Sequence, residues 1–325
     1  MADNPVLEVK NLTIQFNTRQ GTVYAVDNIS FNLQKGETLG LVGESGCGKT
    51  TTVMGLMNMV PPPGRIVKGN IFIDNLDIAL LSEMRLRKEI RWSKISMVFQ
   101  GAMNCLTPVY TIEKQMMETL KQHRTMDRQE AIECIKKYIS VVGLSPEVLK
   151  RYPHELSGGM KQRIVIAIAL FLEPEIVICD EPTTALDVIV QAQIINLLKE
   201  LKQNLGLSII FITHDLATEA EVADKIAVMY AGKIVELGLN DQIYGTQGPA
   251  HPYTQKLLAA TPKLRGKEKD LAFIPGQPPD LVDPPSGCGF HPRCSCVFDR
   301  CKTDTPPLVE IDKSHMSACW RNIDE

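Results

Sequence analysis

A glycine-rich stretch near the N-terminus has the residue types and spacing of a phosphate-binding loop. Gly43 to Thr50 read GESGCGKT, which fits G-x-x-x-x-G-K-[ST] between an apolar run, ETLGLV, and a predicted helix. Backbone N–H groups of such a loop and the helix N-terminus surround phosphate oxygens, Lys49 reaches the β- and γ-phosphates, and the Thr50 hydroxyl ligates Mg²⁺. A glycine turn with a chance lysine is the alternative, which the strand–loop–helix context disfavours. We therefore predict a nucleoside triphosphate site formed by Gly43, Ser45, Gly46, Cys47, Gly48, Lys49, Thr50 and Thr51.

Acidic side chains follow a second apolar run, IVICDEPTTALD. A buried strand that ends at Asp180 places a carboxylate at the carboxyl edge of the sheet, where the Mg²⁺ shell requires it. Glu181 is the candidate general base for an attacking water, and a surface carboxylate that caps the next helix is the alternative. His214 ends another apolar run, FITHD, so we expect it to contact the γ-phosphate and orient that water, rather than to be a structural histidine.

Cysteines gather near the C-terminus with the spacing Cys288-x₅-Cys294-x-Cys296-x₄-Cys301, and Cys319 follows. The N-terminus lacks the pattern of a signal peptide, so we expect a cytosolic chain in which close thiols ligate metal rather than form disulfides. Paired C-x₂-C knuckles are missing, and four thiolates suit either zinc or a [4Fe–4S] cluster. The residues alone leave both metals open, and cysteines that bind no metal are the third alternative. The other four cysteines, Cys47, Cys105, Cys134 and Cys179, are predicted to be buried and structural.

Composition excludes several classes of protein. The chain has 325 residues and a formal net charge of −3, so no overall field favours nucleic acid or an anionic membrane. The most apolar run, IVIAIALFL, is about half of a membrane span. We therefore expect a soluble protein with a sizeable core.

The predicted elements alternate in the manner of an α/β protein. Short β-like runs fill the first hundred residues around the helix GKTTTVMGLMNMV, and 109–155 form a helical insert. The β-branched runs EIVICDE and SIIFITHD are typical of a buried parallel sheet, followed by helices at 187–205 and 215–223 and a hairpin around Ala231-Gly232. A charged linker, TPKLRGKEKD, and a Pro-rich segment come next. We predict a domain at 1–245, with a helical subdomain at about 103–165, and a small C-terminal domain at 246–325.

The stretch ELSGGMKQR, Glu155 to Arg163, resembles the LSGGQ signature of ATP-binding cassette (ABC) proteins. The order of motifs in the chain is also that of ABC ATPases: phosphate loop, MVFQ, helical insert, signature, CDEP, ALD and THD. This resemblance implies a parallel-sheet core like that of RecA, an antiparallel β subdomain and a helical subdomain, with the cysteine-bearing domain appended.

The resemblance also implies roles for single residues. Tyr24 would stack on adenine, with an ordinary strand tyrosine as the alternative. Gln100 would sense Mg²⁺ and water, and Asp187 would lie at the dimer interface. The signature residues Ser157 and Gly159 would bind the γ-phosphate held by a partner subunit in a head-to-tail dimer.

Two further stretches, SGGMKQR and HPYTQKLLAATP, resemble the importers of the dipeptide/oligopeptide/nickel group. That likeness implies an ATPase subunit on the cytoplasmic face of two membrane permease subunits, supplied by an extracytoplasmic binding protein and paired with a paralogous ATPase or with itself. It also implies a [4Fe–4S] cluster on Cys288, Cys294, Cys301 and Cys319. Gly101 and Cys105 depart from the group's usual residues, which affects the expected permease-docking surface.

Two other classes of function compete with an importer motor. A soluble ABC ATPase of translation or DNA repair normally has two fused cassettes or a long coiled-coil insert, and neither is predicted here. A simple P-loop kinase would leave LSGGM and THD without a role. The cargo, whether dipeptide, oligopeptide, nickel or sugar, is not encoded in these motifs.

Overall fold

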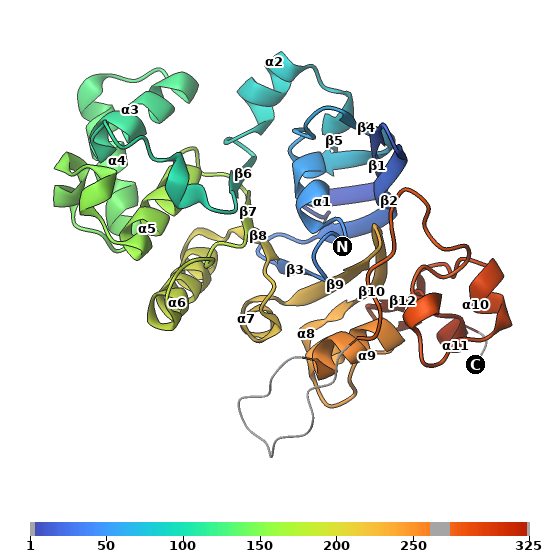
Figure 1. The fold of residues 1–325 in the computed structure, drawn as a ribbon. Coiled ribbons are helices and arrows are strands. Elements are labelled where there is room, and N and C mark those ends of the chain that lie inside the picture. Colours follow the sequence, from blue (N-terminus) through green and yellow to red (C-terminus); the bar gives the residue numbers. More distant parts are fainter. Residues whose placement is uncertain (1–3, 261–273, 324–325) are drawn as a thin grey trace. The chain divides into compact units, whose positions relative to one another are not determined.

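The computed structural model describes residues 4–260 and 274–323, and the predicted charged linker at 261–270 lies outside them. The chain divides into two compact units (Figure 1). The β-rich unit contains Leu7–Leu33, Thr38–Ala79 and the described part of Ile212–Glu325, and the helical unit contains Gln34–Glu37 and Leu80–Phe211.

An antiparallel sheet forms the N-terminal part of the β-rich unit. Its first strand buries Leu7 and Val9, then Leu12 and Ile14, and a register shift at Asn11, where φ is 52°, separates the two alternating pairs. The strands lie in the order β2 (Gly21–Leu33), β1 (Leu7–Thr18), β4 (Gly64–Ile73) and β5 (Leu76–Asp77). This sheet matches the antiparallel β subdomain that the family resemblance implies.

A second set of strands carries the phosphate loop. The fully buried strand β3 (Thr38–Val42) pairs in parallel with β9 (Lys225–Tyr230), which forms an antiparallel hairpin with β10 (Lys233–Leu239). The hairpin turns at Ala231 and Gly232, with φ of 49° and 79°, which confirms the predicted position of the turn. The C-terminal strands β12 (His315–Ser317) and β11 (Val309–Asp312) then extend the sheet beyond β10.

Aromatic rings join the C-terminal segment to β9 in one core. Tyr230, Tyr253 and Phe290 are all buried, and their ring centroids lie 4.6 to 5.3 Å apart. The helices of this unit are α1 (Lys49–Leu56), α7 (Leu216–Val222), α8 (Asn240–Tyr244), α9 (Pro252–Ala259), α10 (Asp299–Thr303) and α11 (Trp320–Ile323), with 3₁₀ turns at Ile78–Leu80 and His291–Arg293.

The helical unit contains the insert expected at 109–155. Helix α3 (Ile112–His123) and helix α4 (Arg128–Val141) form most of it, and a capping box at Asp127 begins α4. Buried strands β6 (Ile95–Val98) and β7 (Ile176–Asp180) pair in parallel, as expected. The remaining elements are α2 (Glu83–Arg85), a π-helical turn (Leu86–Ile90), 3₁₀ turns at Ala102–Cys105, Pro146–Lys150 and Pro153–Glu155, α5 (Gly158–Ala169), α6 (Val188–Leu205) and β8 (Ser208–Ile212).

The run IVIAIALFL lies in the second half of α5 and just beyond it, where most of its side chains are buried within the protein. Among the described residues, we find no helix with the length and apolar character needed to cross a bilayer.

Candidate functional site

The predicted phosphate loop lies between β3 and α1, and its glycines are required by its geometry. Gly43, Gly46 and Gly48 have φ of 148°, 80° and 108°. A Cβ at Gly43 would overlap the carbonyl oxygen of Met229, and one at Gly48 would overlap that of Ala25. Gly46 faces open space, so its requirement is the backbone conformation alone. The loop is thus fixed in a tight curve.

Lys49 begins α1 and turns back over the loop. Its ammonium donates to the carbonyl oxygens of Gly43 at 2.6 Å and Glu44 at 3.0 Å. Gly48 caps α1 without a side-chain acceptor, so the first N–H groups of the helix point out of its N-terminus. Positive charge and backbone N–H groups at one loop are the donors that phosphate oxygens require, so this donor set fits a nucleotide.

Other predicted loop residues differ in their accessibility. Ser45 and Thr50 are exposed, Thr51 is half-buried and Cys47 is buried. Burial raises the pKa of the Cys47 thiol above its usual range, although Lys49 opposes the shift. This cysteine is therefore a packing residue rather than a nucleophile.

Tyr24 lies in β2 with 39% of its surface exposed. Its backbone N–H donates to the carbonyl oxygen of Leu281 at 3.1 Å. Tyr24 also lines a cavity of about 480 Å³ together with residues of the Pro-rich segment, including Pro284 and Pro285. The sequence did not predict that the Pro-rich segment lies against this strand.

The acidic residues of the helical unit stand where the sequence predicts. Asp180 ends β7 and is 1% exposed, and Glu181 follows it with a φ of 50°. Gln100 donates from Nε2 to Glu181 Oε2 at 2.8 Å, and the Thr184 hydroxyl donates to the same oxygen at 2.9 Å. The structure therefore joins Gln100 and the candidate base directly, a contact that the motifs did not predict.

The signature begins helix α5. Ser157 is the N-cap, and its hydroxyl accepts a hydrogen bond from the Met160 N–H at 3.3 Å. A Cβ at Gly159 would lie 2.6 Å from Cγ1 of Val190, so glycine allows the close approach of α6. Asp187 caps α6 in the same way, accepting from the Val190 N–H at 3.0 Å.

His214 belongs to the β-rich unit and follows β8. Its side chain is exposed, which agrees with a contact to a ligand better than with a buried structural role. The next residue, Asp215, caps α7 by accepting from the Ala217 N–H at 3.1 Å.

All five C-terminal cysteines line one small cavity, together with His291 and Trp320. Burial and, to a smaller extent, the neighbouring thiols of Cys301, Cys294 and Cys319 raise the pKa of Cys288 to about 11, although a backbone hydrogen bond from Phe290 opposes the shift. Nevertheless, within 4–260 and 274–323 no three His, Cys, Asp or Glu side chains are arranged to hold a metal ion. The donor types suit a thiolate-bound metal, but the side chains as placed do not form its ligand set, and the predicted cluster is not supported by this geometry.

Of the cysteines predicted to be buried, Cys47 and Cys179 are buried, Cys134 is partly exposed and Cys105 is exposed. The prediction is therefore wrong for Cys105. It ends a short 3₁₀ turn, Ala102–Cys105, in which Ala102 is the buried residue.

The sequence did not predict two residues that contact the phosphate loop. Arg293 contacts Glu44 across 249 positions, and the hydroxyl of Tyr253 accepts from the Glu44 N–H. Glu44 occupies an unspecified position of the loop motif, so the motif gave no signal for these contacts.

Comparisons with known proteins agree with this geometry. Residues 26–184 match the family model of the ABC transporter, and 235–301 match that of the oligopeptide/dipeptide transporter C-terminal region. The chain is 46% identical to the dipeptide transport ATP-binding protein DppD of Bacillus subtilis, over 97% of this chain and 94% of that protein. It is 44% identical to the oligopeptide transport ATP-binding protein OppD of Escherichia coli, over 98% and 94%.

Solved structures give the same fold. The dimeric ABC transporter cassette MJ0796 is 29% identical, with a TM-score of 0.62 over 72% of this chain and 98% of that one. The ABC transporter protein cbiO1 from Clostridium perfringens is 27% identical, with a TM-score of 0.65 over 75% and 92%. The predicted ABC cassette fold is confirmed, and the chain belongs to the family of ATP-binding subunits of dipeptide and oligopeptide ABC importers.

Proposed function

We propose that this ABC ATPase is the ATP-hydrolysing motor of an importer for dipeptides or oligopeptides. It would work in a head-to-tail dimer, with a paralogous ATPase or a second copy, on the cytoplasmic face of two membrane permease subunits. The observation that carries the proposal is the Gln100–Glu181 hydrogen bond of 2.8 Å beside a buried Asp180, in a chain that also has the phosphate loop. That set of residues performs hydrolysis rather than binding alone.

Each residue has a separate role in this proposal. The loop from Gly43 to Thr51 binds the phosphates, and Tyr24 stacks on adenine. Thr50, Gln100 and Asp180 would hold Mg²⁺, which would neutralise charge on the phosphates. Gln100 uses its amide nitrogen to hold Glu181, so its amide oxygen is the group left for the metal.

Glu181 acts as general base and His214 orients the attacking water in the proposed reaction. Two hydrogen bonds, from Gln100 and Thr184, fix the same oxygen of Glu181. These two bonds fix the orientation of the carboxylate that would accept the proton of the water.

The signature is proposed to act in trans. Ser157 and Gly158 are exposed at the N-terminus of α5, a twelve-residue helix whose end favours an anion. Ser157 and Gly159 would contact the γ-phosphate that the partner subunit holds. The similar cassette MJ0796 is described as dimeric, which supports the assembly.

The permease would dock on the segment after Gln100. Exposed apolar side chains there include Val109, which is 71% exposed, and Tyr110, whereas Leu106 is buried and not available for contact. A cysteine at Val109 in an otherwise cysteine-reduced chain should crosslink to a permease subunit in membranes from the native organism. Capture of ribosomal or DNA-repair proteins instead would favour the soluble class of ABC ATPase and contradict the proposal.

The domain boundaries at 1–245 and 246–325, with a helical subdomain at about 103–165, stay part of the proposal.

We propose that the C-terminal region forms a cysteine-bearing domain that holds a [4Fe–4S] cluster on Cys288, Cys294, Cys301 and Cys319, with zinc as the alternative metal and Cys296 as a nearby cysteine that is not a ligand. The proposal rests on the shared cavity that these cysteines line and on their donor type, not on a ligand set formed by the side chains as placed. Protein purified without oxygen should be brown, and Cys301→Ser should bleach it. Colourless anaerobic protein with stoichiometric zinc would assign zinc instead.

A further inference from the structure

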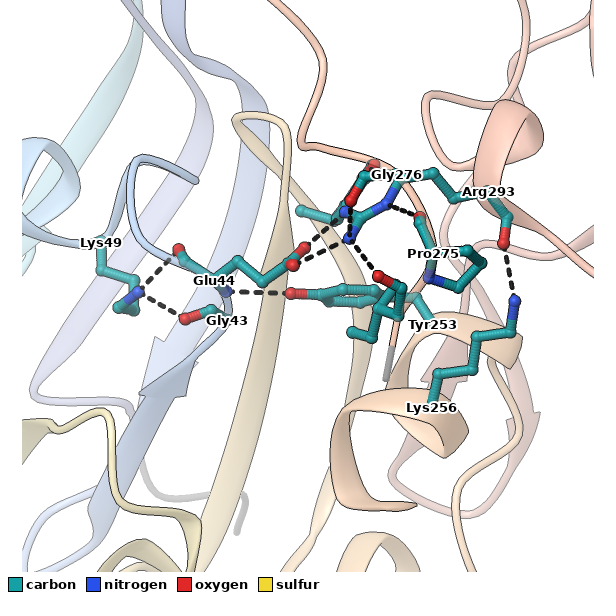
Figure 2. Close-up of polar contacts among 10 residues, drawn as sticks. Gly43, Glu44, Lys49, Tyr253, Lys256, Pro275, Gly276 and Arg293 are labelled. Atoms are coloured by element: carbon teal, nitrogen blue, oxygen red, sulfur yellow. Dashed lines mark hydrogen bonds and ion pairs between the residues drawn. The ribbon is translucent and has the colours of Figure 1, made fainter. Parts of the chain in front are cut away.

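The described part of the C-terminal region contacts Glu44 of the phosphate loop (Figure 2). The backbone N–H of Glu44 donates to the hydroxyl of Tyr253 at 2.9 Å. Its carboxylate accepts from Nη1 of Arg293 at 2.6 Å and from Nη2 at 2.9 Å. Both the backbone and the side chain of this loop residue are therefore held by the last third of the chain.

Arg293 is itself fixed on every side of its guanidinium. Nε donates to the Pro275 carbonyl oxygen at 2.8 Å, and Nη1 also approaches the Tyr230 hydroxyl at 3.3 Å. The backbone carbonyl of Arg293 accepts from Lys256 Nζ at 2.7 Å. The Arg293 side chain is 5% exposed and that of Glu44 is 23% exposed, so this bidentate pair is largely shielded from water.

These contacts affect the position of the Lys49 ammonium, the group that would bind the phosphates. The Glu44 carbonyl oxygen accepts from Lys49 Nζ, and so does that of the adjacent Gly43. A shift of the Glu44 backbone would therefore move two of the acceptors that set the position of the Lys49 ammonium. Preorganised donors cost less to order on binding than mobile ones.

We propose that Arg293 is a positioning residue for nucleotide binding, which fixes the phosphate loop through Glu44, and this inference rests on the proposed nucleotide role of that loop. Arg293 directly precedes Cys294 in the sequence. A structural change in the cysteine-bearing segment would therefore alter the nucleotide affinity of the phosphate loop, which lies in the N-terminal part of the chain.

The same contacts would form if Arg293 only attached the C-terminal segment to the loop. A positioning role predicts that loss of Arg293 weakens nucleotide binding, and simple attachment does not, so nucleotide affinity separates the two roles. We would measure Mg²⁺–ATP affinity of the full chain by isothermal titration calorimetry, for wild type, Arg293→Gln, Glu44→Gln and the double variant. Each single change should weaken binding about tenfold, and the double variant should be no weaker than either alone, because both remove the same pair. Arg293→Lys should fall between, because an ammonium cannot make two parallel bonds.

Lys302→Gln is the matched control, since Lys302 is a basic residue of the same region whose pair with Asp299 is exposed. It should bind ATP as wild type does. If Arg293→Gln does not fold, Tyr253→Phe removes only the acceptor of the Glu44 N–H and should still weaken binding a few-fold.

Unchanged ATP affinity in Arg293→Gln and Tyr253→Phe, with only a lower melting temperature, would overturn the inference. Lys49→Ala separates this failure from that of the proposed function. If Lys49→Ala loses affinity and the two variants do not, the positioning role alone is wrong. If Lys49→Ala also binds normally, the loop is not the nucleotide site and both are wrong.

Discussion

The phosphate loop and the signature segment are both glycine-rich and both lead into a helix, but they are supported in different ways. The loop takes positive φ at Gly43, Gly46 and Gly48, and residues far away in sequence, Arg293 and Tyr253, hold it at Glu44. In the signature, Ser157 caps its own helix through Met160, and Ser157 and Gly158 are exposed whereas Gly159 is buried.

This difference fits the two roles proposed for these segments. A loop that holds a ligand within its own chain gains from being anchored, because its donors are then already in place. A segment that serves a site on another chain must remain accessible, so its support comes from local capping. The variants below test each side of the comparison.

The largest effect is expected at Glu181. Glu181→Gln keeps the shape of the side chain but removes the proton acceptor, so turnover should fall about 10²- to 10⁴-fold while ATP affinity stays close to that of wild type. Steady-state phosphate release and calorimetry measure the two quantities. Glu175→Gln is the control, because Glu175 lies just before β7, as Glu181 lies just after it, and pairs with Lys94 in a partly exposed salt bridge. Wild-type turnover in Glu181→Gln would remove it from the mechanism.

A smaller effect is expected for Ser157→Ala. Loss of the N-cap should cost about 1 kcal/mol of stability, and loss of the predicted γ-phosphate contact should lower turnover of the assembled dimer about tenfold. Ser145→Ala matches it, since Ser145 caps a 3₁₀ turn of the same unit by accepting from the Glu147 N–H. Equal turnover in the two variants would show that the Ser157 hydroxyl serves only as a cap.

If the C-terminal segment packs as in the structure, a substitution at Gly287 should lower the free energy of unfolding. Gly287 has a φ of 70°, and a Cβ there would overlap the Cys301 carbonyl oxygen. Gly248→Ala is the control, with a φ of 71° and no atom within 4 Å of the added Cβ. The control should cost about 1–2 kcal/mol from backbone strain alone, and Gly287→Ala should cost more in urea unfolding. Equal losses would mean that the close packing around Gly287 is not present in solution.

The smallest effect concerns a carboxyl behind the phosphate loop. Glu219 is buried in α7, and neither side-chain oxygen has a hydrogen-bond partner among the described residues. Burial raises the pKa of Glu219 well above its usual range, Lys49 opposes the shift and Asp215 adds to it. The folded state thus retains a proton that the unfolded state releases, so this group's contribution to stability is present below the unfolded pKa and is lost as pH rises.

Glu219→Gln should therefore be more stable than wild type at pH 8, by about 1–2 kcal/mol, and should show no advantage at pH 4. Urea unfolding at the two pH values measures the difference. Glu221→Gln, at an exposed position of the same helix, should change little at either pH. A larger advantage of Glu219→Gln at pH 4 than at pH 8 would contradict the sign of the shift.

The sequence predicted those parts of the fold that local patterns specify. The phosphate loop, the strand that ends at Asp180, the turn at Ala231-Gly232 and helix α6 all follow from nearby residues. Contacts between distant segments were not predictable in this way. Arg293 and Glu44 are 249 positions apart, and the Pro-rich segment that contacts Tyr24 through Leu281 has no periodic pattern to indicate a partner. The burial of Leu106 in the segment after Gln100 was not predictable either, because periodicity does not reveal how a short turn folds.

The central claim is that the two glycine-rich segments work in different subunits. The most direct test is the specific ATPase activity of the purified chain, measured over a wide range of concentration and then with increasing amounts of the partner ATPase. We predict low activity that rises more than linearly with concentration, or on addition of the partner. High activity that is strictly proportional to the concentration of this chain alone, and unchanged by the partner, would contradict the account.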